Sequence, residues 1–165
     1  MARKPAEQSV HRDDIIMAAA DVLQRKGYEA TTMKDIASRV NLTAASLYHH
    51  FRNKDALLLA VLEAGLDLVI EQIEPLLASN KSSAEKLREM VALHVGSLTQ
   101  NTAVGAAMVF EIRALMNMKT PQRDGSLEDV DAQQDFIARR DAFFARRDYF
   151  EELFRTRGAR GHSAG

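Results

Sequence analysis

Side chains that commonly perform catalysis or bind metals are sparse in this 165-residue chain, and they do not fall into catalytic patterns. Cysteine is absent, which excludes disulfides, thiol nucleophiles and thiolate metal sites. The adjacent pair His49 and His50 does not suit a shared metal, because ligands on one helix face need a spacing of three or four residues. Phosphate-binding Gly-rich loops and the Gly-x-Ser-x-Gly and His-Glu-x-x-His motifs are also missing. We therefore predict a protein that is not an enzyme and that needs no cofactor or metal.

Charge is spread unevenly along the chain, although the net charge is only −1. Residues 1–54 contain nine Lys or Arg and six Asp or Glu, whereas residues 55–165 contain 13 and 17. A basic front is typical of proteins that contact nucleic acid, although a difference of this size also arises by chance. No apolar run approaches the ~20 residues that cross a bilayer, and the charged start is unlike a secretory signal. We expect a cytoplasmic protein without membrane contact.

The apolar periodicity predicts an all-α protein. Thr32 and Asp35 have the spacing of a capping box at a helix start, and Asn41 suits the left-handed conformation that ends a helix. Pro75 is expected to end the fourth helix, because proline breaks helix interiors. The expected helices cover residues 10–26, 33–40, 44–50, 54–74, 83–101, 103–118 and 128–156.

Three short helices fall within about 45 residues, and only Asn41-Leu42-Thr43 separates the second from the third. This is the spacing of a helix-turn-helix, in which the second helix projects into the major groove of DNA. An ordinary three-helix bundle with a tight turn would fit the same spacing.

The segment from 28 to 57 distinguishes between these alternatives. In order, it and the residue before it contain Gly27-Tyr28, Thr31-Thr32, Asp35-Ile36-Ala37, Leu47-Tyr48-His49-His50-Phe51 and Asn53-Lys54-Asp55-Ala56-Leu57. Over about residues 12–62 the chain resembles the DNA-binding domain of the TetR family of bacterial transcriptional repressors. Asn41 stands where the family often has glycine, and it suits the same backbone.

The resemblance implies that residues 1–54 form a DNA-binding domain. Small methyl-bearing side chains of the recognition helix would meet thymine methyls, and polar tips would hold phosphates and fix the register. Helix N-termini favour anions, and a lysine at one of them adds a full charge. The residues implied in operator contact are Thr32, Thr43, Ala44, Ala45, Ser46, Tyr48, His49 and Lys54.

Some roles in this segment have alternatives. The ring of Tyr48 could pack under the turn instead of facing DNA, or do both. His50 is expected to pack or form a hydrogen bond inside the domain. Arg3 and Lys4 could form an arm in the minor groove, but a disordered start is the expected form.

Residues 55–157 are predicted to form a helical ligand-binding domain. In the family, the corresponding helices enclose a pocket for a small effector whose binding releases DNA. The helix over 103–118 is apolar nearly all round, so we expect it to be central and buried, with Arg113 paired to an acidic effector or to a carboxylate of the last helix. The candidate lining residues, which would also fit a plain core, are Met90, His94, Met108, Phe110, Glu111, Arg113, Met116, Phe136 and Phe143.

The C-terminal sequence departs from the family. Residues 158–165 are polar and Gly-rich and are predicted to be a disordered tail. The two long helices through which most members dimerise have no counterpart, so the family's homodimer is in doubt. We expect a weak dimer or a monomer, with uncovered apolar surface around Phe144, Tyr149 and Phe150.

The prediction is a DNA-binding regulator that represses from a palindromic double-stranded operator and is released by a small apolar or acidic effector. The alternative is a truncated helical protein that binds a ligand or another protein and no longer represses on its own.

Overall fold

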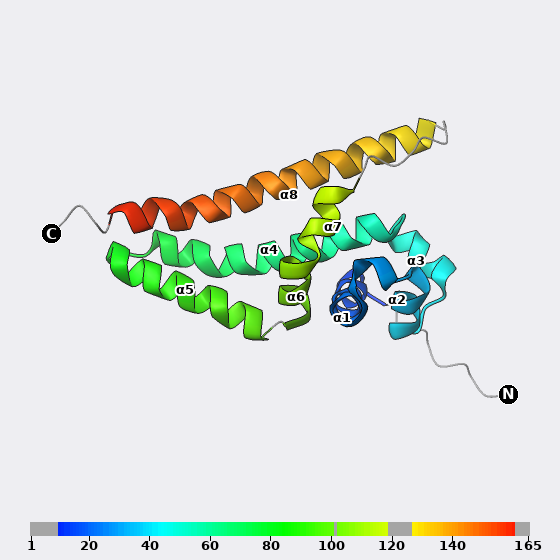
Figure 1. The fold of residues 1–165 in the computed structure, drawn as a ribbon, viewed down its shortest axis with the longest axis horizontal. Coiled ribbons are helices and arrows are strands. Elements are labelled where there is room, and N and C mark those ends of the chain that lie inside the picture. The colour runs from blue at the N-terminus through cyan, green and yellow to red at the C-terminus, as the bar shows by residue number, and fades with distance from the viewer. Residues whose placement is uncertain (1–9, 101, 119–126, 161–165) are drawn as a thin grey trace.

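The computed structural model describes residues 10–100, 102–118 and 127–160, and every element within those ranges is a helix (Figure 1). The all-α prediction is confirmed. In chain order the helices are α1 (Arg12–Ala30), α2 (Met33–Arg39), α3 (Ala44–His50), α4 (Lys54–Ala78), α5 (Ser83–Gln100), α6 (Thr102–Phe110), α7 (Ile112–Asn117) and α8 (Leu127–Arg160).

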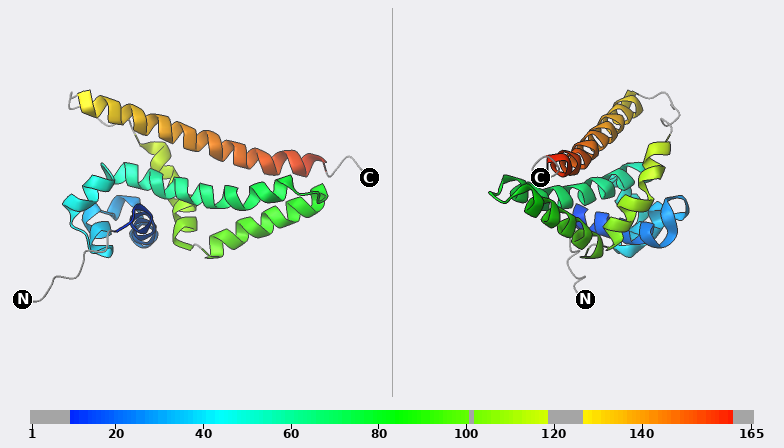
Figure 2. Two further views of the ribbon diagram at one scale, coloured as in Figure 1. Left: turned by 180° about the vertical axis from the view of Figure 1, so that it is seen from behind. Right: turned by 60° about the vertical axis from the view of Figure 1, so that its left-hand side comes forward.

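Helix α4 is the axis of the molecule (Figures 1 and 2). It begins at the head formed by α1, α2 and α3 and runs to the opposite end, where α5 turns back beside it. Helices α6 and α7 cross between these parts, and α8 runs along the side of α4 and contacts α5. Within the described residues, no helix is long and apolar enough to cross a membrane.

The head shares its core with the rest of the molecule. The buried face of α1 contains Ile15, Ala19 and Leu23 at four-residue steps, as its sequence periodicity predicts. These side chains belong to the same buried cluster as Leu58 of α4 and residues of α6, α7 and α8. The head is therefore packed directly on the helices that follow it.

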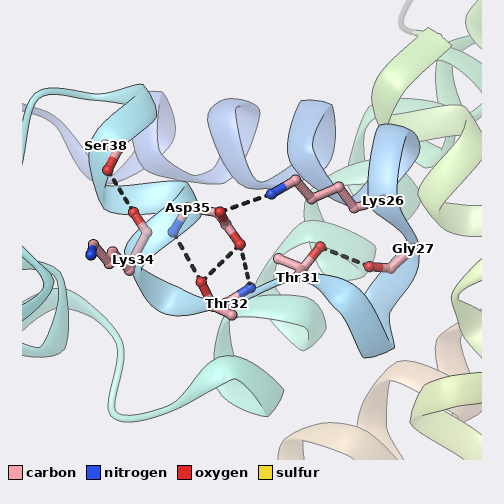
Figure 3. Close-up of polar contacts among 7 residues, drawn as sticks. All are labelled: Lys26, Gly27, Thr31, Thr32, Lys34, Asp35 and Ser38. Carbon is pink, nitrogen blue, oxygen red and sulfur yellow. Dashed lines mark hydrogen bonds and ion pairs between the residues drawn. The ribbon is translucent and has the colours of Figure 1, made fainter.

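Helix α1 extends beyond its predicted end. Gly27 has φ of 73°, the positive value expected for a glycine at a helix stop, but helical geometry resumes and continues to Ala30. The Thr31 hydroxyl donates a hydrogen bond of 2.7 Å to the Gly27 carbonyl and so bridges the kink (Figure 3). A Cβ on Gly27 would lie 3.7 Å from a carboxylate oxygen of Glu111, so α1 meets the end of α6 at this point.

The prediction that Pro75 ends α4 is wrong, because the helix continues to Ala78 with Pro75 inside it. Proline removes the backbone hydrogen bond to the residue four positions earlier, which is Glu71. Both Glu71 and Pro75 are exposed, so water can satisfy that carbonyl near the end of the helix.

The predicted helix over 103–118 is two helices. Glu111 interrupts it with φ of −97° and ψ of −7°, and α7 starts at the next residue. The expectation that this segment is buried all round is also wrong: Val104, Ala107 and Leu115 are buried, but Phe110 and Met116 are exposed. Helix α6 packs against α1, α4 and α5, and this leaves one side of it open.

Helix α8 carries a seven-residue repeat that attaches it to α4. Arg139 forms an ion pair of 2.5 Å with Glu63, and Arg146 forms one of 2.5 Å with Asp67. The helix covers the predicted range 128–156 and reaches Arg160, three residues into the segment predicted as a tail. Residues 161–165 lie outside the described residues, as do Arg3 and Lys4.

Candidate nucleic-acid interface and ligand cavity

The turn between α2 and α3 is closed by backbone hydrogen bonds. Asn41 has φ of 56°, as predicted for the residue that ends α2. The Leu42 amide then reaches back to the Ala37 carbonyl at 2.9 Å, and the Val40 amide donates to the same carbonyl at 3.2 Å. A left-handed residue followed by a bond to the third-last helical carbonyl is the Schellman ending of a helix. This motif fixes the direction in which α3 leaves α2.

The start of α2 is held by the predicted capping box (Figure 3). The Asp35 amide donates to the Thr32 hydroxyl oxygen at 3.2 Å, and the Thr32 amide donates to the Asp35 carboxylate at 3.0 Å. Lys26 of α1 also donates to this carboxylate, at 2.8 Å. The hydrogen bonds from Lys26 and then from Thr32 lower the pKa of Asp35 to about 2. The N-terminus of α2 therefore already holds a negative charge, so the phosphate contact predicted for Thr32 has a carboxylate beside it.

Helix α3 presents one face to the outside. The Thr43 side chain caps the helix by accepting a hydrogen bond of 3.0 Å from the Ser46 amide. Leu47 is buried and anchors the helix, whereas Ala45, Tyr48 and His49 are exposed. These three residues have the i, i+3, i+4 spacing that places side chains on one helix face.

Two alternatives for this helix are decided by exposure. Tyr48 is 52% exposed, so its ring does not pack under the turn. The expectation that His50 lies inside the head is wrong, because its side chain is exposed. Helix α3 is only seven residues long and Leu47 alone is buried in it, so most of its surface stays open.

Lys54 occupies the first position of α4 and ties it to the end of α1. Its ammonium group donates a hydrogen bond of 2.9 Å to the Tyr28 carbonyl and lies 4.2 Å from the centre of the Tyr28 ring. The Tyr28 hydroxyl in turn donates to the Asp55 carboxylate. Burial and the Asp55 carboxylate raise the pKa of Tyr28. Lys54 thus has a structural role, and its predicted phosphate contact stays a prediction.

A cavity of about 270 Å³ lies between α4, α5, α6 and α8. Most of its wall is apolar, and its polar groups come from α5 and α8. The lining residues are Gly65, Leu66, Leu68 and Val69 of α4, His94 of α5, Val104, Gly105, Met108 and Val109 of α6, and Arg147, Phe150 and Glu151 of α8.

Of the predicted lining residues, His94 and Met108 face this cavity. Met90, Glu111 and Phe143 are buried elsewhere, and Phe136 is half-buried against the main core. Phe110, Arg113 and Met116 are exposed, so the prediction that they line a pocket is wrong. Arg113 lies on the open side of α7, where a charge needs no buried partner. The position of Arg113 therefore gives no support to an acidic effector.

The cavity wall from α4 was missed by sequence reasoning, and the last helix contributes Arg147, Phe150 and Glu151 to the cavity instead of the expected Phe136 and Phe143. Leu66 and Val69 fit the apolar stripe expected for α4, and such a stripe does not show which of its members border empty space. The seven-residue repeat of α8 could have indicated Phe150 as a lining residue. Phe143 and Phe150 hold equivalent places in the repeat, and Phe143 lies in the core whereas Phe150 lies in the cavity wall.

Comparisons with known proteins agree with the head geometry. Residues 15–61 match the family described as bacterial regulatory proteins, tetR family. Over 83 residues the chain is 34% identical to the HTH-type transcriptional repressor KstR2 of Mycolicibacterium smegmatis, a match that covers 50% of this chain and 40% of that repressor. The chain therefore spans less than half of the length of this relative.

Solved structures resemble the chain over most of its length. A TetR-family transcriptional regulator from Bordetella parapertussis 12822 superimposes with a TM-score of 0.72 at 22% identity, covering 96% of this chain and 72% of that one. AibR in complex with isovaleryl coenzyme A and operator DNA superimposes with a TM-score of 0.63 at 26% identity, covering 93% and 75%. The head motif and the fold are thus both similar to those of the TetR family of bacterial regulatory proteins, whose family model matches residues 15–61.

Proposed function

We propose that this protein is a DNA-binding transcriptional regulator, a repressor whose affinity for its operator is controlled by a small molecule in the cavity. The observation that carries the proposal is the outward face of α3, where Ala45, Tyr48 and His49 are exposed on a helix fixed by a cap and a Schellman turn. Exposed methyl and polar groups on such a helix suit base edges and phosphates in the major groove. AibR supports the pairing of operator and ligand, because a related fold holds both at once.

The helices supply a physical route between the two sites. Helix α4 starts at the head with Lys54 and forms a cavity wall with Gly65 and Val69. Helix α6 forms another wall and packs on α1. A ligand that changes the spacing of α4 and α6 therefore also changes the support of the head. In this proposal residues 1–54 read DNA, residues 55–157 respond to the ligand, and two copies bind a palindromic operator.

The test compares two exposed tyrosines. Tyr48→Ala should weaken binding to DNA from upstream of the protein's own gene about tenfold, because a hydrogen bond to a charged phosphate contributes ~1.5 kcal/mol or more. Tyr149→Ala is the matched control, since Tyr149 is 58% exposed on α8, away from the head. Fluorescence anisotropy measures affinity, and circular dichroism checks that both variants stay helical. Equal affinities for the two variants would remove α3 from the DNA interface.

A further inference from the structure

The geometry points to an uncharged ligand for the cavity: a compact apolar molecule with one hydrogen-bonding end, such as an alcohol or a ketone, and not a carboxylate. This inference rests on the proposed function for its regulatory meaning, but its test needs no DNA. It decides between the apolar and the acidic effector, which the sequence leaves open.

Apolar side chains form most of the cavity wall. Leu66 and Val69 of α4 and Val104, Met108 and Val109 of α6 contribute hydrocarbon walls. Burying an apolar ligand surface there is favourable by roughly 25 cal/mol per Å². The polar groups of the lining, by contrast, come from His94 of α5 and from Arg147 and Glu151 of α8. A ligand that suits this wall is apolar over most of its length and polar at one end.

The one Arg or Lys at the polar end is already paired with carboxylates. Arg147 is the sole Lys or Arg among the lining residues that the structure describes, and its guanidinium pairs with the Glu151 carboxylate one helical turn later. The guanidinium also lies 4.0 Å from the Asp148 carboxylate. An acidic ligand would have to displace Glu151 from Arg147 and then lie beside the displaced carboxylate. Two carboxylates, those of Glu151 and Asp148, already lie against this one guanidinium, so an added anion would meet more negative than positive charge there, and this end disfavours an anion.

A neutral polar group meets no such obstacle. A hydroxyl or carbonyl oxygen can accept a hydrogen bond from Arg147 while the ion pair with Glu151 stays in place, because a guanidinium has five N–H donors. The volume limits the rest of the molecule. A cavity of about 270 Å³ is slightly smaller than the ~300–1,000 Å³ of sites for drug-sized ligands. The ligand is therefore a single ring or a medium-length chain.

Isothermal titration calorimetry with probes of equal chain length tests the inference on the full chain. We expect 1-octanol and 2-octanone to bind, and octanoate to bind at least tenfold more weakly at a pH where it is ionised. Isovaleryl coenzyme A, which carries several negative charges, is the fourth probe and should also bind more weakly than the alcohol. Tighter binding of octanoate or of the thioester, or no heat from either neutral probe at millimolar concentration, would overturn the inference.

Two pairs of variants locate the effect. Glu151→Gln removes the nearer of the two carboxylates from Arg147 and leaves only Asp148, so octanoate should gain about tenfold in affinity while 1-octanol changes little. Glu152→Gln is the control, because Glu152 is the adjacent residue and does not line the cavity. Val69→Phe should abolish octanol binding by filling the cavity, whereas Val91→Phe on the exposed side of α5 should not.

Each outcome of the variants has a consequence. Octanol binding that survives Val69→Phe in a folded protein would place the probe elsewhere and contradict the assignment. An octanoate affinity that Glu151→Gln leaves unchanged would contradict the charge argument. Octanol that binds as expected but leaves operator affinity unchanged would count against the proposed ligand control and not against the chemistry of the cavity.

Discussion

Asn41 gives the helix-turn-helix its angle at the cost of an unfavourable backbone conformation. Its φ of 56° is the one positive value outside glycine among the described residues. Replacement by alanine should lower the free energy of unfolding by about 1–2 kcal/mol, because a Cβ in this region meets the following carbonyl and the local side-chain hydrogen bonds of asparagine are lost. Replacement by glycine should leave the stability nearly unchanged. Urea denaturation followed by circular dichroism measures both variants.

A neighbouring turn residue provides the control for this prediction. Thr43 has φ of −78°, so Thr43→Ala removes a helix cap without any left-handed strain, at an expected cost of about 1 kcal/mol. Thr43→Gly should lower the free energy of unfolding by only a few tenths of a kcal/mol relative to the unmodified protein. If Asn41→Gly destabilised the protein as much as Asn41→Ala, the turn would depend on the asparagine side chain and not on its backbone.

Local features of the site could be predicted from the sequence, because they depend on residues a few positions apart. The cap pairs Thr32 with Asp35 and Thr43 with Ser46 are of this kind. The position of Arg113 could not be predicted in this way. Its exposure depends on which side of α7 other helices cover, and periodicity within one segment carries no information about distant helices. The exposure of His50 was missed for the same reason.

At the scale of elements, Gly65 allows α4 and α6 to approach closely. A Cβ added there would lie 2.8 Å from Cγ of Met108 and 2.9 Å from Cγ1 of Val104. Gly65→Ala gains roughly 0.5–1 kcal/mol of helix propensity, but forcing a methyl group into a packed crossing costs about 1–3 kcal/mol. We expect net destabilisation in a thermal unfolding experiment.

A double variant separates the two effects. Met108→Ala removes one of the two close contacts while Val104 stays in place, so in this background Gly65→Ala should destabilise the protein less than it does alone. The coupling energy between the two substitutions should exceed about 0.5 kcal/mol, as is usual for residues in contact. Additive effects would show that the crossing relaxes without cost and that glycine is not required there.

The ends of the helices could be predicted from the sequence where a local capping residue sets them. They could not be predicted where contacts with other helices or with solvent decide them. Asn53 caps α4 as its type and position predict, with its side chain accepting from the Ala56 amide at 2.8 Å. Pro75 fails to end the same helix because its lost hydrogen bond falls on an exposed carbonyl. The break at Glu111 lies in a segment that is apolar nearly all round, and no proline or glycine next to Glu111 marks a helix boundary. The cavity is formed by four helices, so its walls follow from their packing alone.

For the whole molecule, operator recognition should require two copies. One helix of seven residues makes few base contacts, and each good contact contributes ~1–3 kcal/mol of discrimination. Two recognition helices spaced by one turn of DNA, ~34 Å, read a palindrome together. DNA with two half-sites at this spacing should bind about a hundredfold more tightly than DNA with one, because the second contact becomes intramolecular.

Anisotropy titrations with one-site and two-site DNA measure this ratio of affinities. The control is a two-site DNA with five extra base pairs between the half-sites, which places them on opposite sides of the double helix. Sedimentation equilibrium of the free protein shows how much dimer exists before DNA is added. Equal affinities for all three DNAs would mean that a single head accounts for the binding.

The contact between Gly27 and Glu111 has a mechanical consequence. Ion pairs from Arg39 to Asp21 and from Lys26 to Asp35 join α2 to α1. The kink of α1 at Gly27 lies against Glu111, the residue between α6 and α7. Helices bend most easily where their regular geometry is interrupted. Under the proposed function, a ligand that shifts α6 would therefore act on α1 at Gly27, and α3 would change direction without any helix unfolding.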